Sequence, residues 1–532
     1  MDLGSALRRS AERFPARRAV GGPRPRTYAE WDARTDRLAR GLAASGVAPG
    51  QRVLFALGGG EPLASLHLAA QKLGAVSVPL SVRLSAAEAA YCLDDCAPAL
   101  VVTDDSTEGK LAEALRAADA CPPVTVEAEL AAAGGRGEGR AGPPPGEDAI
   151  SVLLYTSGTT GRPKGVPRSH RAEYFAALAH LIQARQPIGA VSLGVMPMFH
   201  TMGLRALLAS VLCSGTWVPQ ASFDAGQSAD LIRDEGIDTL YLVPTAYWAL
   251  VRTGRLADLR SVRRIAYAGA PMSPSLAGEL AAAFQPEAMV NHFGSTEVYT
   301  FSVSADTARK PGCAGRAGVF GRLRLVSPER GAPPDAIVGD GEQGQVIVAM
   351  DSPEAFAGYW HRPDADARAI RDGWYYTGDL GHLDDEGDLW VSGRVDDMIN
   401  SGGENIYPDD IERTLAGAPC VDQVVVAGTP HEKWGQAVTA FFVPAGGTCD
   451  ERTIARFDEW VRTESGLPSM KRPKRYVAVR SIPTSAVGKI LRRQLTTDGA
   501  EVLADSADSA AGGGADRGAD RGAAAFRAGG QP

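Results

Sequence analysis

A loop of small residues that ends in a lysine is the sharpest chemical signal in the chain. Residues 155–165 read Tyr-Thr-Ser-Gly-Thr-Thr-Gly-Arg-Pro-Lys-Gly and follow an apolar segment, residues 150–154, that is typical of a strand. Small residues expose backbone N–H groups and Lys164 adds positive charge, so the loop suits a polyphosphate. A Walker loop needs Ser or Thr after its lysine, whereas Gly165 follows here. A plain surface turn is the alternative.

Three later motifs combine carboxylates, glycines and a lysine. They are Asn-His-Phe-Gly-Ser-Thr-Glu at 291–297, Tyr-Thr-Gly-Asp at 376–379 and Pro-Thr-Ser-Ala-Val-Gly-Lys-Ile-Leu-Arg-Arg at 483–493. A carboxylate beside a triphosphate suits a hard cation, and a carboxylate also accepts well from ribose hydroxyls. Singly, these motifs would be a helix cap, a turn and a solvated lysine. Their order behind the first loop favours a nucleotide site.

Together these motifs resemble those of the adenylate-forming superfamily, which comprises acyl- and aryl-CoA synthetases, stand-alone adenylation domains and luciferases. The resemblance covers roughly residues 5–495. The segments GRVDDMINSGGENIYP and KRPKRY are similar to those of the 4-chlorobenzoate–CoA and benzoate–CoA ligase group. The resemblance implies an AMP-forming acid–thiol ligase, which uses ATP and Mg²⁺ to activate a carboxylic acid as acyl-AMP and then transfers the acyl group to coenzyme A.

The resemblance also assigns roles at the ATP site. Thr296 is expected to contact phosphate, Glu297 to bind Mg²⁺, Asp379 to accept the ribose hydroxyls and Arg394 to contact the ribose. Phe293 is expected to stack on adenine, where most relatives have Tyr. The residues expected to bind ATP or AMP are Thr156, Ser157, Gly158, Thr159, Thr160, Lys164, Gly269, Ala270, Pro271, Asn291, His292, Phe293, Gly294, Thr296, Asp379 and Arg394.

Catalysis is expected to depend on a mobile lysine. By resemblance, the ammonium of Lys489 bridges the substrate carboxylate and the α-phosphate, where negative charge concentrates. Asp396 falls at the position of the family's hinge, about which the C-terminal domain rotates between the two half-reactions. The expected catalytic residues are His200, Thr296, Glu297 and Lys489.

A basic segment near the C-terminus predicts the acceptor. Residues 471–475 read Lys-Arg-Pro-Lys-Arg, and cationic side chains favour the phosphates of CoA. Arg472 and Lys474 match CoA-contacting positions of the resembled group, as does Trp434 and, more weakly, Arg83, whereas Met470 stands where an adenine-stacking Phe is expected. A solubilising basic face is the alternative. Transfer to a carrier protein, an amine or a second small acid also stays open.

The residues expected at the acyl pocket predict the class of acid. By resemblance they are His200, Thr201, Met202, Tyr241, Ala268, His292, Gly294, Tyr299 and Thr300. Aromatic and Met side chains suit a flat ring better than an alkyl chain. Several of these residues form hydrogen bonds, and unpaired buried polar groups are costly, so a hydroxy- or aminobenzoate is predicted. The alternative is that these groups pair with one another.

The elements that position these motifs follow an α/β pattern. Residues 27–47 have helical apolar spacing, and residues 318–395 read as a small β-rich module. Strands are expected within 50–57, 74–80, 99–102, 151–155, 191–196, 239–243 and 263–268. We expect a large N-terminal domain of two α/β subdomains and the β-rich module at 1–395, a mobile α+β domain at 396–495 and a disordered tail at 496–532.

The composition and net charge of the chain limit the classes of molecule that it is expected to bind. The net charge of −8 disfavours nucleic acid, whose binding needs a basic face. The chain has no run of 18 apolar residues, its N-terminus does not read as a signal peptide, and its seven cysteines do not suggest a disulfide framework, so a cytoplasmic enzyme away from membranes is expected. Monomer and homodimer stay open. A P-loop phosphotransferase, which would release ADP, and a non-catalytic descendant are the rival interpretations.

Overall fold

The computed structural model describes residues 2–135, 137, 141–156, 163–329, 331–401, 404–484, 490–497 and 499–506. The chain divides into a large unit, which comprises the residues up to Val395 and also Thr484, and a small unit, which comprises Asp396–Pro483 and the described residues from Ile490 onward. The large unit is α/β and the small unit is a sheet with helices, so the predicted fold class is confirmed. The exact domain bounds stay a prediction.

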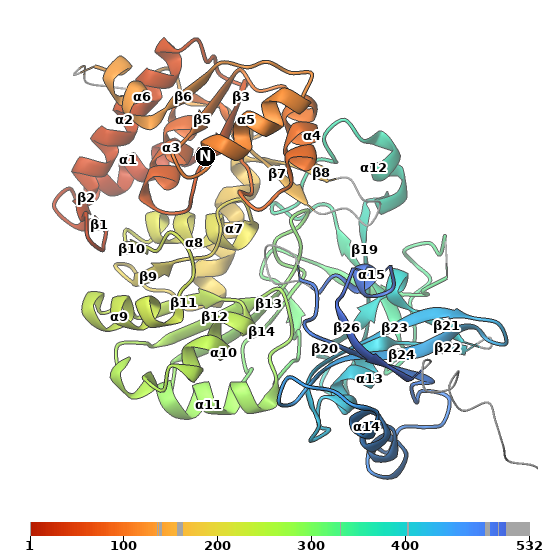
Figure 1. The fold of residues 1–532 in the computed structure, drawn as a ribbon. Coiled ribbons are helices and arrows are strands. Elements are labelled where there is room, and N and C mark those ends of the chain that lie inside the picture. Colours follow the sequence, from red (N-terminus) through yellow and green to blue (C-terminus); the bar gives the residue numbers. More distant parts are fainter. Residues whose placement is uncertain are drawn as a thin grey trace, which may run out of the picture. The chain divides into compact units, whose positions relative to one another are not determined.

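The first sheet of the large unit contains the strand β8, which begins at Lys164 and is labelled in Figure 1. Among the described residues its strand order is β6-β5-β3-β4-β7-β8, parallel except for β8. The strands are β3 Arg52–Ala56, β4 Val76–Pro79, β5 Leu100–Thr103, β6 Val124–Val126, β7 Ile150–Thr156 and β8 Lys164–Ser169. The helices that connect or flank them are α3 Glu61–Leu73, α4 Ala86–Cys96, α5 Glu108–Ala117 and α6 Glu127–Ala133. Thr156 ends β7 opposite Lys164 at the start of β8.

The second sheet carries the other nucleotide and acyl motifs. In the part that the structure describes, its order is β15-β14-β13-β12-β11-β9-β10-β1-β2. Its strands are β1 Arg18–Val20, β2 Arg26–Thr27, β9 Val191–Gly194, β10 Thr216–Pro219, β11 Thr239–Leu242, β12 Arg264–Ala268, β13 Ala288–Phe293, β14 Ser302–Ser304 and β15 Arg316–Ala317. The strands β9 to β13 are parallel, so β11, β12 and β13 bring their carboxyl ends to one edge.

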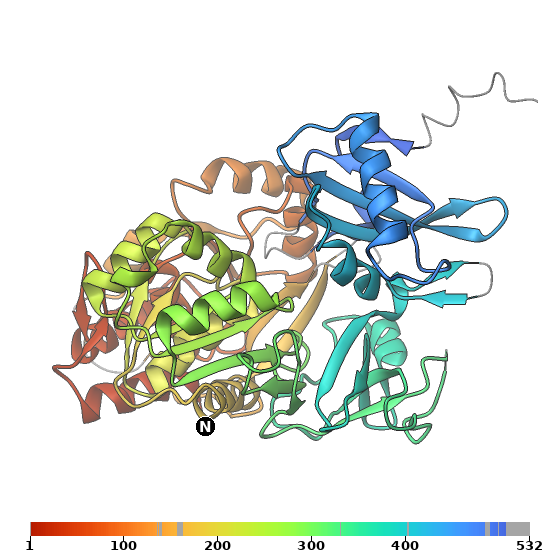
Figure 2. The same ribbon diagram turned by 90° about the horizontal axis from the view of Figure 1, so that it is seen from below.

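Helices cover both faces of this second sheet. One layer contains α9 Ala225–Glu235, α10 Pro244–Arg252 and α11 Pro274–Phe284, seen in light green in front of the sheet in Figure 2. On the other face lie α7 His170–Gln183 and α8 Thr201–Leu212, which share a core with α1 Leu3–Arg13 and α2 Tyr28–Ala44. Capping boxes at Thr27 and Ser85 fix where α2 and α4 begin.

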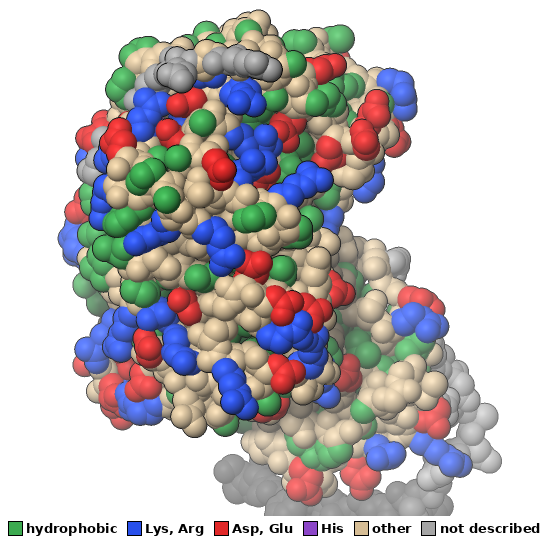
Figure 3. Space-filling model, turned by 90° about the vertical axis from the view of Figure 1, so that its left-hand side faces the viewer, with side chains coloured by type: hydrophobic (Ala, Val, Ile, Leu, Met, Phe, Trp, Pro, Cys, Tyr) green, Lys and Arg blue, Asp and Glu red, His purple; other side chains and the backbone are tan. Residues whose placement is uncertain are grey.

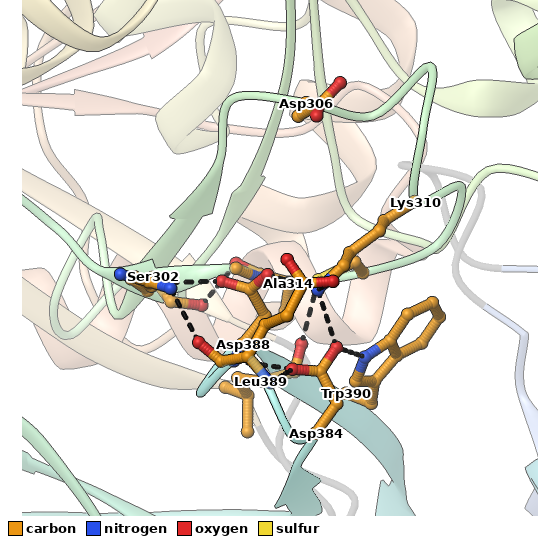
Figure 4. A network of polar contacts seen from close by, with 12 residues as sticks. Ser302, Asp306, Lys310, Ala314, Asp384, Asp388, Leu389 and Trp390 are labelled. Atoms are coloured by element: carbon orange, nitrogen blue, oxygen red, sulfur yellow. Dashed lines mark hydrogen bonds and ion pairs between the residues drawn. The ribbon is translucent and has the colours of Figure 1, made fainter.

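The β-rich module contains β16 Leu323–Val326, β17 Gly344–Ala349, β18 Ile370–Arg371, β19 Trp374–Leu383, β20 Leu389–Arg394 and the helix α12 Pro363–Ala369. Figure 4 shows how its β19–β20 turn is held. The ammonium of Lys310 lies 2.8 Å from Asp384 and 2.6 Å from Asp388, and the Trp390 indole donates to Asp384. This network fixes the hairpin that carries Asp379 and Arg394.

The small unit corrects one prediction. Its strands are β21 Ile399–Ser401, β22 Glu404–Ile406, β23 Val421–His431, β24 Gly435–Pro444, β25 Arg475–Val479 and β26 Val502–Asp505, with α13 Pro408–Leu415, α14 Glu451–Thr463 and α15 Arg492–Leu495. The disordered tail predicted at 496–532 is therefore wrong for β26. This strand pairs with β25, and Arg475 forms an ion pair with Asp505. Residues 507–532 lie outside the described part of the chain.

On the face of the large unit seen in Figure 3, Lys and Arg side chains are interspersed with Asp and Glu, so positive charge is not gathered there. Within the described ranges, no helix combines the length and apolar character needed to cross a membrane.

Candidate active site

A lysine, a glutamate and a tyrosine meet at the start of β8. The Lys164 ammonium lies 4.3 Å from the centroid of the Tyr359 ring, and the Tyr359 hydroxyl donates to Glu297 Oε1 at 2.7 Å. Burial lowers the pKa of Lys164, an effect that the charge of Glu297 opposes. Burial also raises the pKa of Tyr359, with Glu297 as the next cause, so its hydroxyl stays a donor. The site therefore offers a cation and a carboxylate that can bind a charged ligand.

A buried arginine fixes the loop that carries Glu297. Arg168 of β8 is fully buried and donates from Nη1 to the carbonyls of Thr296 at 3.1 Å, Glu297 at 3.2 Å and Glu354 at 2.8 Å. Its Nε lies 2.6 Å from Glu173. The guanidinium therefore ties the loop after β13 to the strand that begins with Lys164.

The path of that loop requires a glycine. A Cβ on Gly294 would lie 2.0 Å from the carbonyl oxygen of Tyr299, so a larger residue would push the loop apart. The Phe293 ring packs edge-on against the Phe301 ring, with the ring centroids 5.2 Å apart. Phe293 is half-buried. Asn291 donates from Nδ2 to the carbonyl of Cys313 at 2.8 Å. Thr296 and Glu297 are both buried.

The predicted ribose residues form a pair on one hairpin. Asp379 of β19 and Arg394 of β20 are register partners, and their side chains form an ion pair at 2.8 Å. Gly378 has a φ of +77°, and a Cβ there would lie 2.6 Å from Arg394 Nη2, so glycine lets the two side chains approach. The arginine holds the carboxylate in place, and the carboxylate keeps acceptor capacity for hydroxyls.

The segment predicted to lie against adenine follows β12. Ala268 is the register partner of His292 on β13 and is half-buried. Gly269, Ala270 and Pro271 come directly after the strand and are exposed, so their backbone is accessible to a planar base. Five of the predicted ATP-site residues or catalytic residues lie outside the described ranges: Ser157, Gly158, Thr159, Thr160 and Lys489.

Several of the predicted acyl-pocket residues come together behind this edge. Met202, Tyr241 and Ala268 belong to one apolar cluster, and His292 meets the Tyr241 ring edge-on at 5.6 Å. His200 caps α8, accepting from the Met202 N–H at 3.4 Å, and Thr201 Oγ1 lies 3.5 Å from the same His200 nitrogen.

Two predicted pocket residues have partners of their own. The Tyr299 hydroxyl donates to Glu173 at 3.2 Å, and the Thr300 hydroxyl donates to Glu354 at 3.1 Å. The expectation that these hydroxyls need a substrate partner is therefore wrong. Burial, the largest cause, raises the pKa of Glu354. Among the predicted pocket residues, the polar groups that still lack a hydrogen-bond partner are therefore those of His292 and of the side chains around it.

The predicted acceptor residues of the small unit form a basic cluster around an indole. The Lys474 ammonium lies 5.8 Å from the centroid of the Trp434 ring and Lys433 lies 5.6 Å from it, while the His431 ring stacks on Trp434 at 4.3 Å. Arg472 donates to the Leu467 carbonyl at 2.8 Å. In the large unit, Arg83 is exposed. Asp396, the predicted hinge, begins the small unit.

Sequence reasoning missed Tyr359, Arg168, Glu354, His180 and Arg205. Each acts through partners far away in sequence, such as Arg168 with residues 128 and 186 positions later. The sequence around Arg168, Lys-Gly-Val-Pro-Arg-Ser, carries no signal of its burial. All five residues became visible only in the folded chain.

Comparison with known proteins extends these observations. The AMP-binding enzyme family matches residues 7–360, and the AMP-binding enzyme C-terminal domain matches residues 410–489. The chain is 33% identical to 4-chlorobenzoate–CoA ligase of Arthrobacter sp, covering 88% of this chain and 89% of the relative. It is 35% identical to feruloyl-CoA synthase of Amycolatopsis sp, covering 93% of this chain and 98% of the relative.

Other similar proteins differ in the acid that they are named for. Long-chain-fatty-acid–CoA ligase FadD13 of Mycobacterium tuberculosis is 33% identical, with 93% of this chain and 98% of the relative covered. The structure of ATP-bound MatB from Rhodopseudomonas palustris superposes with a TM-score of 0.84 at 28% identity, covering 94% of this chain and 99% of that chain.

Tyr359→Phe removes the hydroxyl that holds Glu297. A hydrogen bond to a charged group contributes about 1.5–3 kcal/mol, so we expect kcat/KM for MgATP to fall about 10–100-fold in ATP–pyrophosphate exchange. Tyr247→Phe is the matched control, since this buried hydroxyl donates to the carbonyls of Leu240 and Ala266 within the second sheet. An unchanged MgATP response in Tyr359→Phe would contradict the role given to this hydroxyl.

Proposed function

Because the chain belongs to the AMP-binding enzyme family, we propose that it activates a hydroxy- or amino-substituted aromatic acid as aryl-AMP and then transfers the aryl group to CoA. The predicted adenylate-forming superfamily and the predicted enzyme class, an AMP-forming acid–thiol ligase, are confirmed by the family matches and the relatives. The specific acid and the acceptor are the parts that we propose.

The observation that carries the proposal is the grouping of charged residues in the large unit. Lys164 and Glu297 meet at Tyr359, and the Asp379–Arg394 pair lies on the hairpin of the β-rich module. A cation for phosphate, a carboxylate for a metal and a carboxylate for ribose hydroxyls are the three groups that bound ATP requires. This chemistry favours adenylation over transfer of the terminal phosphate.

Glu297 fits a magnesium ion shared with a nucleotide. Among the described residues, His, Cys, Asp and Glu do not gather in threes to form a metal cage. Mg²⁺ commonly binds through one or two carboxylates together with substrate phosphates. Glu297 would hold the ion, and the ion would supply charge neutralisation at the phosphates. The Tyr359 hydroxyl orients the carboxylate for this purpose.

The first half-reaction joins the acid to AMP. The substrate carboxylate oxygen attacks the α-phosphorus, the new C–O–P bond forms, and the bond to the β-phosphate oxygen breaks, so pyrophosphate leaves. Lys164 stabilises the negative charge of the phosphates, and Lys489 stabilises charge at the α-phosphate. In the second half-reaction the CoA thiol, having lost its proton, attacks the acyl carbon and AMP leaves.

The pocket favours a ring. Tyr241 and His292 are both buried aromatic groups in edge contact, and Met202 packs beside Tyr241. Flat, closely spaced rings suit an aromatic acid better than a flexible alkyl chain. The relatives named for chlorobenzoate and ferulate are named for aromatic acids. The relative named for long-chain fatty acids represents the alternative class of substrate.

The acceptor is proposed from the basic cluster of the small unit. Lys433 and Lys474 flank the Trp434 ring. An indole can stack on the adenine of CoA, and the two ammonium groups suit its phosphates. A carrier protein, an amine or a second small acid would be the acceptor if acyl-AMP forms but free CoA yields no thioester.

The deciding experiment compares acids. We expect kcat/KM, measured by pyrophosphate release, to be higher for salicylate, anthranilate or 3-hydroxyanthranilate than for benzoate and 4-chlorobenzoate. A preference for the plain or chlorinated ring would refute the proposed hydroxyl or amino substituent. A preference for medium-chain fatty acids would refute the proposal that the acid is aromatic. Release of ADP and phosphate in place of AMP and pyrophosphate would refute adenylation itself.

Lys489→Ala should impair only the first half-reaction. Loss of one preorganised charge at a transition state costs roughly 10²–10³-fold in rate, so adenylation should fall by that factor while thioester formation from supplied aryl-AMP stays near normal. Lys110→Ala removes an exposed lysine of the large unit that contacts the Val82 carbonyl and serves as the control. Equal losses in both half-reactions would contradict the role of Lys489.

Asp396→Pro should give the opposite pattern. Proline fixes φ near −65° and removes the N–H, so a rotation about this residue is blocked while aryl-AMP still forms. Single-turnover assays with and without CoA separate the two steps. Asp396→Ala leaves the backbone free and should keep both rates, and normal CoA transfer in Asp396→Pro would remove this residue from the hinge.

A further inference from the structure

Three basic side chains from three elements gather behind the predicted acyl pocket. His180 of α7 stacks on His292 of β13 with ring centroids 5.1 Å apart, and it lies 4.6 Å from the Tyr241 ring. Arg205 of α8 completes the group, with its guanidinium 4.6 Å from the Tyr299 ring. The exposed fractions of His180, Arg205 and His292 are 1%, 2% and 2%. These positions are as buried as those of the apolar core.

The two imidazoles are neutral and lack partners. Within the described residues, both nitrogens of His292 and Nδ1 of His180 are buried without a hydrogen-bond partner. Burial, followed by the charge of Arg205, lowers the pKa of His180 to about 3, and burial holds the pKa of His292 well below its usual range. A neutral imidazole offers one donor and one acceptor. The pair therefore needs a ligand atom that both accepts and donates.

Arg205 adds a charged donor. Its Nε is buried without a hydrogen-bond partner in the described part of the chain, while its charge opposes the rise that burial causes in the pKa of Glu354 and of Tyr241. The contrast is Arg168, which packs on the other side of the network at 3.8 Å from the same Tyr299 ring and pairs with Glu173. A guanidinium keeps its charge when buried and requires an acceptor. The Tyr299 ring thus contacts one arginine that pairs with Glu173 and a second arginine whose Nε can donate to an added oxygen.

The space beside His180 is small. A cavity of about 10 Å³ lies beyond His180 and Tyr241, lined also by Gln186, Ser192, Ala206 and Thr239. This volume admits one water molecule at most. A substituent that reaches these residues from the pocket must therefore be small.

We infer that His180, Arg205 and His292 form a polar floor of the acyl pocket that selects an acid with a ring hydroxyl over one with an amino group, a halogen or hydrogen there. The inference rests on the proposed function and narrows it. A hydroxyl oxygen accepts from Arg205 and from one imidazole, and its proton is donated to the other imidazole. An aromatic amine donates but accepts poorly, so it leaves Arg205 without an acceptor, and a halogen satisfies neither histidine.

The test compares kcat/KM across matched acids, measured by pyrophosphate release. For the wild-type protein we expect the best hydroxybenzoate isomer to exceed benzoate and the same aminobenzoate isomer by at least about 100-fold, because sites built around a substrate hydroxyl reject analogues that lack it. His292→Leu should reduce the hydroxybenzoate-to-benzoate ratio by at least about 10-fold, and the ratio is the readout because a general loss of activity lowers both rates alike.

Arg205 is tested with two substitutions, of which one removes the positive charge and the other keeps it. Arg205→Met should reduce the hydroxybenzoate-to-aminobenzoate ratio by at least about 10-fold, and Arg205→Lys, which restores a cation, should recover most of it. His67→Leu is the control, because His67 is a buried imidazole outside this region that contacts Ser77. It should leave both ratios unchanged. If Arg205→Met fails to fold, Arg205→Lys and His292→Leu decide the matter.

The outcomes separate the two levels of the proposal. Absence of pyrophosphate exchange with every aromatic acid would overturn the proposed function. Turnover of aromatic acids with a hydroxyl preference below about 3-fold, or with a preference that none of the variants alters, would overturn this inference alone.

Discussion

The fully buried guanidinium of Arg168 is the interaction on which the site depends. It ties β8 to the carbonyls of Thr296, Glu297 and Glu354, and Glu173 balances its charge. Breaking a buried ion pair is strongly destabilising, because the remaining charge is left uncompensated in a medium of low dielectric. The arginine therefore has one stable position, and that position sets where the Glu297 carboxylate lies relative to Lys164. Two segments more than 120 residues apart in sequence become one rigid surface.

The same network reaches the acyl side of the large unit. Glu173 accepts from Tyr299, and Glu354 accepts from Thr300, so the carboxylates near Arg168 also fix residues of the predicted pocket. The centroid of the Tyr299 ring lies 3.8 Å from the guanidinium carbon of Arg168 and 4.6 Å from that of Arg205. Buried polar networks are stable only when each member is satisfied. Among the described residues, buried polar atoms without a partner remain on Arg168 and Glu354 as well as on Arg205, His180 and His292, and the two histidines and Arg205 lie on the side of the predicted pocket, where a ligand atom could satisfy them.

Local motifs made much of this site predictable. The phosphate-type loop and the Asn291–Glu297, Tyr376–Asp379 and Lys489 motifs are contiguous in sequence, and the predicted strands at 99–102, 151–155 and 263–268 match β5, β7 and β12 closely. Contacts between distant segments were not predictable, because nothing in the sequence around Tyr359 or Arg205 marks their partners. The tail prediction failed because the composition of the whole segment hid the short strand β26, which pairs with β25 and is joined to it by the Arg475–Asp505 ion pair.

A second arginine, which is partly buried, joins two segments of the small unit. Arg492 lies in the 483–493 motif and pairs with Asp409 and Glu412 of α13. The charge of Asp397, next to the predicted hinge, also raises the pKa of Arg492, although burial opposes this. Burial raises the pKa of Glu412 to about 7, which reflects the cost of enclosing this charge. Since such a joint resists internal rearrangement, any rotation at Asp396 would carry α13 and the segment after Lys489 together as one rigid body, and the change between half-reactions would be concentrated at the hinge.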